Sequence, residues 1–280
     1  MDSDDQRAGS SPVPSADEIE LERALFRAVA EESLSVVYQP LVRSGDGTLL
    51  GLEVLLRWVR PGVGTVSPAE FIPVAERCGL MPSIGAWVLR EGCAELALWS
   101  REGLSRDLVL HVNLSRAEIV DGRLDESIKR ALVESGLTPE RICVEVTEPV
   151  LLSGGEPAEA AVHRLTDMGV RLCLDDFGTN SSIAALTRYQ FDHAKVGRQL
   201  IGGLDSPAHR ARLIRGLLGM AKALGTTLIA EGIEHGEELD RVAALGISEI
   251  QGYATGRPAS GEALRHAFRQ RGSAAPLTSG

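Results

Sequence analysis

Carboxylate, amide and ammonium side chains interrupt or directly follow most of the short apolar segments in this sequence. These residues are Glu53, Asn113, Glu145, Glu148, Asp175, Asp176, Lys195, Glu231, Glu234 and Gln251. A carboxylate buried without a partner is costly, so acids on so many apolar segments indicate a shared cation. Their oxygen donors suit Mg²⁺ or Mn²⁺, whereas zinc prefers His or Cys. Two such ions about 4 Å apart can hold a phosphodiester and activate water for in-line attack.

Each of these residues, taken alone, also has a purely structural explanation. A single acid at a strand end can be exposed or ion-paired, and Lys195 fits a buried counter-ion as well as a catalytic group. Arg57 fits an ion pair or a phosphate contact equally well. His111 precedes Asn113 by two residues on the same strand face, but it fits a core histidine better than a ligand. Only the whole set of acids favours a cation site.

Eight short segments rich in β-branched and aliphatic residues predict the strands that position these side chains. They are residues 34–42, 49–58, 109–114, 141–147, 170–175, 193–196, 227–230 and 249–253. After the second segment the intervals have helical periodicity, and several end in Gly, which indicates parallel strands with crossover helices. Residues 43–48 are too few for such a crossover, so the first two strands should form an antiparallel hairpin.

These elements predict an α/β fold, namely a closed (β/α)₈ TIM-like barrel with an antiparallel first strand. An open doubly wound sheet is the alternative. In a barrel the site forms at the carboxyl ends of the strands, where the polar side chains occur. We expect residues 1–16 to be a disordered tail, residues 17–270 a single domain starting with a helix that Asp17 can cap, and residues 271–280 a loose tail.

The composition narrows the function classes. Against 39 acidic residues there are 29 Lys and Arg, and the resulting net charge of -10 disfavours binding of duplex nucleic acid. No run of 18 apolar residues occurs, and the acidic opening has no apolar core, so we expect neither a membrane span nor secretion but a cytoplasmic location. Cys78, Cys93, Cys143 and Cys173 show no metal-ligand spacing and are expected to be buried, reduced thiols.

The ordered motifs YQP, LEVLLRW, FIPVAERCGL, VNLS, VEVTE, LDDFGT, KVG, AEGIE and QGY resemble the EAL-domain family. The resemblance covers about residues 34–260, and nine motifs in one order are highly specific. Members of that family hydrolyse cyclic di-GMP to linear pGpG with Mg²⁺ or Mn²⁺. Degenerate members only bind the nucleotide, or bind a protein partner instead. The resemblance therefore implies a barrel fold, cyclic di-GMP as ligand, one or two metal ions, and the family's habit of forming homodimers.

The resemblance also implies roles for single residues. The first metal ion would be held by Glu53, Asn113, Glu145 and Asp175, and the second by Asp176 and Glu231. Lys195 would orient or activate the attacking water, and Gln251 would support the site. Glu148 and Glu234 match glutamates that steady the loop after the Asp pair. Nucleotide contacts fall on Gln39, Leu55 and Arg57, the last on a phosphate.

Three departures from the family pattern bear on activity. The naming motif has Val54 in place of Ala, which leaves the Glu53 ligand intact. The family's Lys-x-Asp ends here in Gly197, so a carboxylate expected near the second metal is missing. The loop DDFGTNSSI is one residue shorter than usual, with Asn180 in place of a Gly and an aromatic residue. We therefore expect slow hydrolysis; the alternatives are an inactive cyclic di-GMP receptor and a protein-binding module that has lost the nucleotide.

Overall fold

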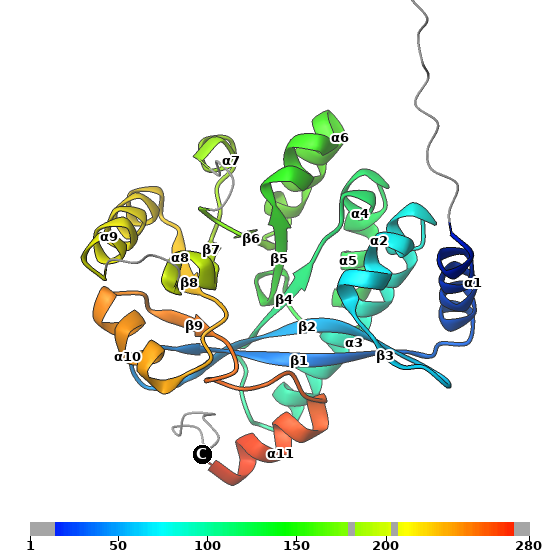
Figure 1. Ribbon diagram of the computed structural model, residues 1–280, viewed down its shortest axis with the longest axis horizontal. Coiled ribbons are helices and arrows are strands. Elements are labelled where there is room, and N and C mark those ends of the chain that lie inside the picture. Colours follow the sequence, from blue (N-terminus) through cyan, green and yellow to red (C-terminus); the bar gives the residue numbers. More distant parts are fainter. Residues whose placement is uncertain (1–14, 179–182, 203–206, 272–280) are drawn as a thin grey trace, which may run out of the picture.

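The computed structural model describes residues 15–178, 183–202 and 207–271, and its sheet closes into an eight-stranded barrel surrounded by helices (Figure 1). Going round the sheet, the order is β1, β9, β8, β7, β6, β5, β4 and β2, and pairing of β1 with β2 closes the ring. The strands are β1 (Leu34–Arg43), β2 (Leu49–Arg60), β4 (Val109–Asn113), β5 (Ile142–Thr147), β6 (Arg171–Asp175), β7 (His193–Val196), β8 (Thr227–Ala230) and β9 (Glu249–Gln251). The predicted barrel is confirmed, and the open sheet is wrong.

The first strand runs against both of its neighbours. β1 pairs antiparallel with β2, from Leu34 opposite Trp58 to Val42 opposite Leu49, and antiparallel with β9. The other barrel pairs, from β2–β4 round to β8–β9, are parallel. The predicted hairpin is therefore confirmed. The structure adds β3 (Gly64–Val66), which extends β2 beyond the barrel as a second antiparallel hairpin.

Helices cover the outer face of the barrel (Figure 1). They are α1 (Ala16–Ala30), α2 (Pro68–Arg77), α3 (Met81–Arg101), α4 (Arg116–Val120), α5 (Leu124–Ser135), α6 (Glu148–Asp167), α7 (Ile183–Arg188), α8 (Arg198–Gly202), α9 (Pro207–Leu224), α10 (Gly236–Leu245) and α11 (Gly261–Arg271), with a 3₁₀ turn at Pro139–Arg141. Ser15, rather than the expected Asp17, caps α1 through a reciprocal hydrogen-bonded box with Glu18. No helix in the described ranges is both long and apolar enough to cross a membrane.

Side chains alternate between two cores along each strand because successive residues of a strand face opposite ways. Even-numbered residues such as Leu52, Leu110 and Val144 face the helices in one large apolar cluster. A smaller cluster fills the inside of the barrel, and its members are Leu41, Val109, Cys143, Cys173 and Ile229. Every member of the inner cluster has an odd number, as do most of the predicted site residues. The same alternation therefore places the candidate chemistry inside the barrel.

Candidate functional site

Lys195 lies at the centre of the predicted site. Its side chain extends from β7 with 1% of its surface exposed, and Nζ lies 2.7 Å from Oε2 of Glu53 and 2.7 Å from Oε2 of Glu145. These two glutamates come from β2 and β5, which lie on either side of β4. The structure thus joins three predicted residues from three strands into one buried ionic cluster. These residues are therefore neither exposed at a strand end nor paired with a neighbour in sequence.

Amide side chains complete the hydrogen bonding of Glu53. Asn113 Nδ2 donates to Glu53 Oε1 at 2.6 Å, and Gln251 Nε2 donates to Glu53 Oε2 at 2.5 Å. Gln251 Nε2 also lies 3.4 Å from Oε1 of Gln39, whose backbone is directly opposite Glu53 in the β1–β2 pairing. Side chains from three other strands, β4, β7 and β9, therefore hold the carboxylate of Glu53 in place, as a metal-binding or substrate-binding group requires.

The cluster carries more negative than positive charge. Four carboxylates act on the Lys195 ammonium, from Glu145, Glu53, Glu231 and Asp175. Burial opposes the charge of Lys195, but these acids raise its pKa well above the usual value. Burial would also raise the pKa of Glu53, yet the charge of Lys195 and three side-chain hydrogen bonds hold it at about 2. Lys195 and Glu53 therefore form a charged pair across the neutral pH range.

The remaining acids are less well compensated. Burial raises the pKa of Glu231 to about 7. The negative charges of Asp175 and Glu53 raise it further, while the positive charge of Lys195 lowers it. Burial likewise raises the pKa of Asp175, which ends β6. The charge of Lys195 lowers both pKa values but offsets the effect of burial only in part. A further cation at this end of the barrel would supply more positive charge.

The donor set fits a hard divalent cation. Glu53, Asn113, Glu145 and Asp175 offer oxygen atoms, which Mg²⁺ and Mn²⁺ prefer, and the excess of buried carboxylates provides the charge. Lys195 Nζ now bridges Glu53 and Glu145. The ammonium therefore already neutralises part of the charge that an ion would use.

The backbone after β6 has an unusual conformation at the second acid of the pair. Asp176 has φ of 55°, in the left-handed region that Asp tolerates better than most residues. Its N–H donates to Oδ1 of Asp175 at 2.9 Å, and the next N–H, of Phe177, donates to the carbonyl of Lys195 at 2.8 Å. Asp176 is exposed. The shortened loop and Asn180 lie outside the described residues.

The position that lacks the family carboxylate is spacious. Gly197 directly follows β7 and is half-buried, and a Cβ placed there would have no atom of the described residues within 4 Å. Its φ is not in the left-handed region. An aspartate could therefore occupy this position without a steric clash at Cβ or backbone strain.

The other predicted residues take more varied positions. Leu55 and Arg57 follow Glu53 on the same face of β2, both half-buried, and Arg57 Nη1 donates to the carbonyl of Leu56. Glu148 is buried at the start of α6, with no hydrogen-bond partner for Oε2. Glu234 is exposed and ion-paired with Arg198, the residue after Gly197. The hydrogen-bonded network around Lys195, as far as the structure describes it, does not include Glu148 or Glu234.

One buried partner of the site was interpreted from the sequence as a core histidine rather than a site residue. His111 Nδ1 lies 2.8 Å from Oε1 of Glu145, whose other oxygen contacts Lys195. His111 is buried, as expected for a core histidine, but it is also part of the ionic network. The available signal was its spacing of two residues from Asn113, which places both side chains on one strand face.

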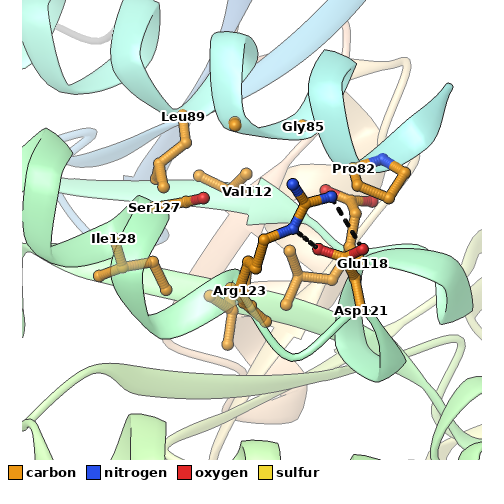
Figure 2. A pocket seen from close by; sticks show the side chains of 13 residues that line it. Pro82, Gly85, Leu89, Val112, Glu118, Asp121, Arg123, Ser127 and Ile128 are labelled. Atoms are coloured by element: carbon orange, nitrogen blue, oxygen red, sulfur yellow. Dashed lines mark hydrogen bonds and ion pairs between the residues drawn. The ribbon is translucent and has the colours of Figure 1, made fainter.

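The small cavity in Figure 2 lies away from this cluster, on the helical layer between α3, α4 and α5. Its volume is about 20 Å³, which is room for about one water molecule. Glu118 lines it and accepts hydrogen bonds from the N–H and hydroxyl of Ser115, while Arg123 pairs with Asp121 as Figure 2 shows. Glu118 therefore has a structural role as the capping partner of α4.

Comparison with known proteins agrees with the motifs. The family model described as "EAL domain" matches residues 22–258. A Caulobacter vibrioides protein described as an uncharacterized signaling protein is 37% identical over 245 residues, covering 87% of this chain and 30% of that protein. The bifunctional diguanylate cyclase/cyclic di-GMP phosphodiesterase MucR of Pseudomonas aeruginosa is 32% identical over 249 residues, covering 89% of this chain and 36% of MucR. The chain thus spans about a third of each of these two relatives.

Solved structures show the same architecture. One described as "PaMucR Phosphodiesterase, c-di-GMP complex" superposes with a TM-score of 0.81 at 33% sequence identity. The match covers 88% of this chain and 99% of that one. The similarity therefore extends through the whole barrel.

Proposed function

The chain belongs to the EAL domain family, and from this premise we propose that it is a metal-dependent phosphodiesterase that hydrolyses cyclic di-GMP to linear pGpG, at a reduced rate. The observation that carries the proposal is the buried cluster in which Lys195 Nζ lies 2.7 Å from both Glu53 and Glu145. A barrel that had lost its ligand would have little reason to keep four acids around one ammonium, because such a cluster is costly to bury.

The proposed roles follow from where each side chain lies. Glu53, Asn113, Glu145 and Asp175 would hold the first Mg²⁺ or Mn²⁺, and Asp176 and Glu231 the second. A bound ion would supply Lewis-acid stabilisation of the phosphate charge. Lys195 would orient the attacking water and stabilise developing negative charge, because its ammonium is buried and keeps its proton. Gln251 would keep Glu53 in place through the 2.5 Å hydrogen bond.

Nucleotide binding would use the outer part of β1 and β2. Gln39 lies opposite Glu53, and Leu55 and Arg57 continue from Glu53 on the same face of β2. Arg57 has only a carbonyl partner in the structure described, so its guanidinium is available for a phosphate. We also propose that Glu148 and Glu234 steady the segment after Asp176.

The reduced rate follows from Gly197. In the family pattern this position holds a carboxylate near the second metal, and a missing ligand or supporting group lowers metal affinity or activity by about 10- to 1000-fold. The same observation favours a second candidate, a receptor that binds cyclic di-GMP without cleaving it. A third, a module that binds a protein partner, is less consistent with the intact Glu53, Asn113 and Glu145 cluster.

The wider proposal keeps the other expectations from the sequence. It comprises a single domain over residues 17–270, a cytoplasmic location, homodimer formation as in the family, and no binding of duplex nucleic acid or membrane.

The deciding experiment is a chromatographic time course of the purified protein with excess cyclic di-GMP and Mn²⁺. More than one equivalent of pGpG per protein supports the enzyme, and Glu53→Gln should then abolish product because the carboxylate is replaced by a neutral amide. Gly197→Asp should raise the rate about 10-fold or more, since the position has room for the side chain. Intact nucleotide with tight binding would support the receptor, and no binding with any metal would support the protein-binding module.

A further inference from the structure

A second cluster of metal-binding side chains lies inside the barrel, next to the Lys195 site on the amino-terminal side. It comes from four consecutive strands and contains His111 of β4, Cys143 of β5, Cys173 of β6 and His193 of β7. Each residue is two positions before a predicted site residue on its strand, so it faces the barrel interior one layer further in. All four side chains are buried.

The donor atoms of this cluster are close together. His111, Glu145 and Cys173 each place one possible ligand atom so that the three atoms lie within 4.8 Å of one another. In the described parts of the chain this is the one group of three His, Cys, Asp or Glu side chains that is so close. Cys143 Sγ lies 4.0 Å from Nδ1 of His193, and the two histidine rings meet edge to face at 5.7 Å. Around a tetrahedral zinc ion, ligand atoms are about 3.5 Å apart. The donors thus need only small side-chain movements to reach that spacing.

Two features distinguish this cluster from ordinary core packing. Among the described residues, no geometric hydrogen bond satisfies the buried Nε2 of His111, and the Cys143 thiol acts on the same imidazole, whereas buried ring nitrogens are nearly always paired. The other ring nitrogen, Nδ1, lies 2.8 Å from Oε1 of Glu145, so the imidazole and the carboxylate of the group are already in contact. Cys143 and Cys173 form no disulfide, and the apolar side chains of Leu41, Val109 and Ile229 pack around them.

We propose that His111, Glu145 and Cys173, with Cys143 as a further donor, bind one thiophilic divalent ion of the zinc class. This mixed sulfur, nitrogen and oxygen set is soft, in contrast to the oxygen ligands one layer above. Binding replaces the thiol protons of the two cysteines by bonds to the metal, so about two protons leave per ion. Glu145 belongs to both layers and would link them. Cys143 and Cys173 are buried and form no disulfide, as expected from the sequence, and the proposal adds a role in metal binding.

The test uses Co²⁺ as the probe, because cobalt bound to thiolate gives an intense near-ultraviolet charge-transfer band that oxygen ligands do not give. Titration of the reduced full-length chain should produce this band with an endpoint of one ion, and Zn²⁺ should displace it. Cys173→Ala should weaken binding at least 10-fold, and Cys143→Ala should lower the intensity of the band. No charge-transfer band at any Co²⁺ concentration would overturn the proposal.

Cys93→Ala is the matched control, because Cys93 is equally buried but lies on α3 outside the barrel. This variant should give the same cobalt titration as the wild type, and loss of the charge-transfer band in it would refute the site. Survival of the band in the double variant Cys143→Ala/Cys173→Ala would also refute the site. Thermal unfolding of each apo variant shows whether it is folded, and His111→Gln provides a second test if a cysteine variant does not fold. The result is independent of hydrolysis, since Glu53→Gln should abolish turnover and keep the band.

Discussion

Replacing Lys195 by Met should reverse the sign of the contribution that Glu53 makes to the pH dependence of stability. In the native cluster the pKa of Glu53 falls from an ordinary value near 4.5 to about 2, so its ionised form favours the folded state. That contribution is present above pH 4.5 and is lost as pH falls towards 2. By linkage it amounts to about 3 kcal/mol, and breaking a buried ion pair by removing one partner costs about 3–5 kcal/mol.

In Lys195→Met two buried carboxylates, Glu53 and Glu145, lose the ammonium 2.7 Å away while the side-chain volume is kept. Burial then raises the pKa of Glu53 above its value in the unfolded chain, and the pKa of Glu145, which burial already raises beside Lys195, rises further. A raised carboxyl pKa means that folding is favoured by protonation, so the stability of the variant should rise as pH falls from 7 to 5. Near pH 7 the variant should be less stable than the wild type by about 3–5 kcal/mol.

The assay is urea unfolding with EDTA at pH 5 and pH 7, followed by circular dichroism. Addition of Mg²⁺ should stabilise the variant more than the wild type, because the freed carboxylates bind a cation more tightly. Lys129→Met is the control, since Lys129 is exposed and, in the described parts of the chain, its one ion pair is with Asp125 at 3.3 Å, which is worth under about 1 kcal/mol. Equal pH slopes in Lys195→Met and the wild type would show that Lys195 does not compensate the two acids.

Three further predictions concern backbone and buried groups. Gly85→Ala should lower stability by about 1–3 kcal/mol in urea unfolding, because its Cβ would lie 1.7 Å from Glu118 Oε1. Gly216→Ala is the control: a Cβ there has no described atom within 4 Å, so this variant should not be destabilised. Burial raises the pKa of Glu118 to about 7, so this residue should make the wild type less stable as pH rises from 4.5 to 7. Glu118→Gln should remove up to about 3 kcal/mol of that loss of stability. An unchanged pH profile in this variant would contradict the effect of burial. Asp176→Ala should be less stable than Asp176→Asn by about 1 kcal/mol in urea unfolding, because Asn tolerates φ of 55° and Ala does not. Equal unfolding midpoints of the two variants would argue against backbone strain at this position.

The strands were predictable because their pattern is local. Buried strands are short apolar runs bounded by turns, and the six-residue link 43–48 determined the hairpin without tertiary information. The three-residue strand β3 was missed because Gly64–Val66 has too few residues to show a period. Within α6, Gly155 breaks the helical backbone at φ 58°, so the local sequence around it does not show one continuous helical pattern.

The site was predictable in its membership but not in its contacts. Alternation along each strand shows that Glu145 and His111 face inward, but their 2.8 Å contact depends on the register of β4 against β5. In that register His111 lies beside Cys143, and Asn113 lies beside Glu145. No spacing within one segment contains this information. The same reason explains why Cys143 and Cys173 appeared unrelated at 30 residues apart, although their strands are neighbours.

The position of Lys195 limits how the site can take up a cation. Its ammonium contacts both Glu53 and Glu145 and neutralises part of their charge, so an ion sharing those carboxylates must bind beside an ammonium that stays protonated. The poorly compensated acids, Asp175 and Glu231, are therefore the groups that gain most from an added ion. A carboxylate at position 197 would increase that negative charge, and Gly197 does not provide it. Weak binding of the second ion, rather than loss of the first, is the expected reason for slow turnover.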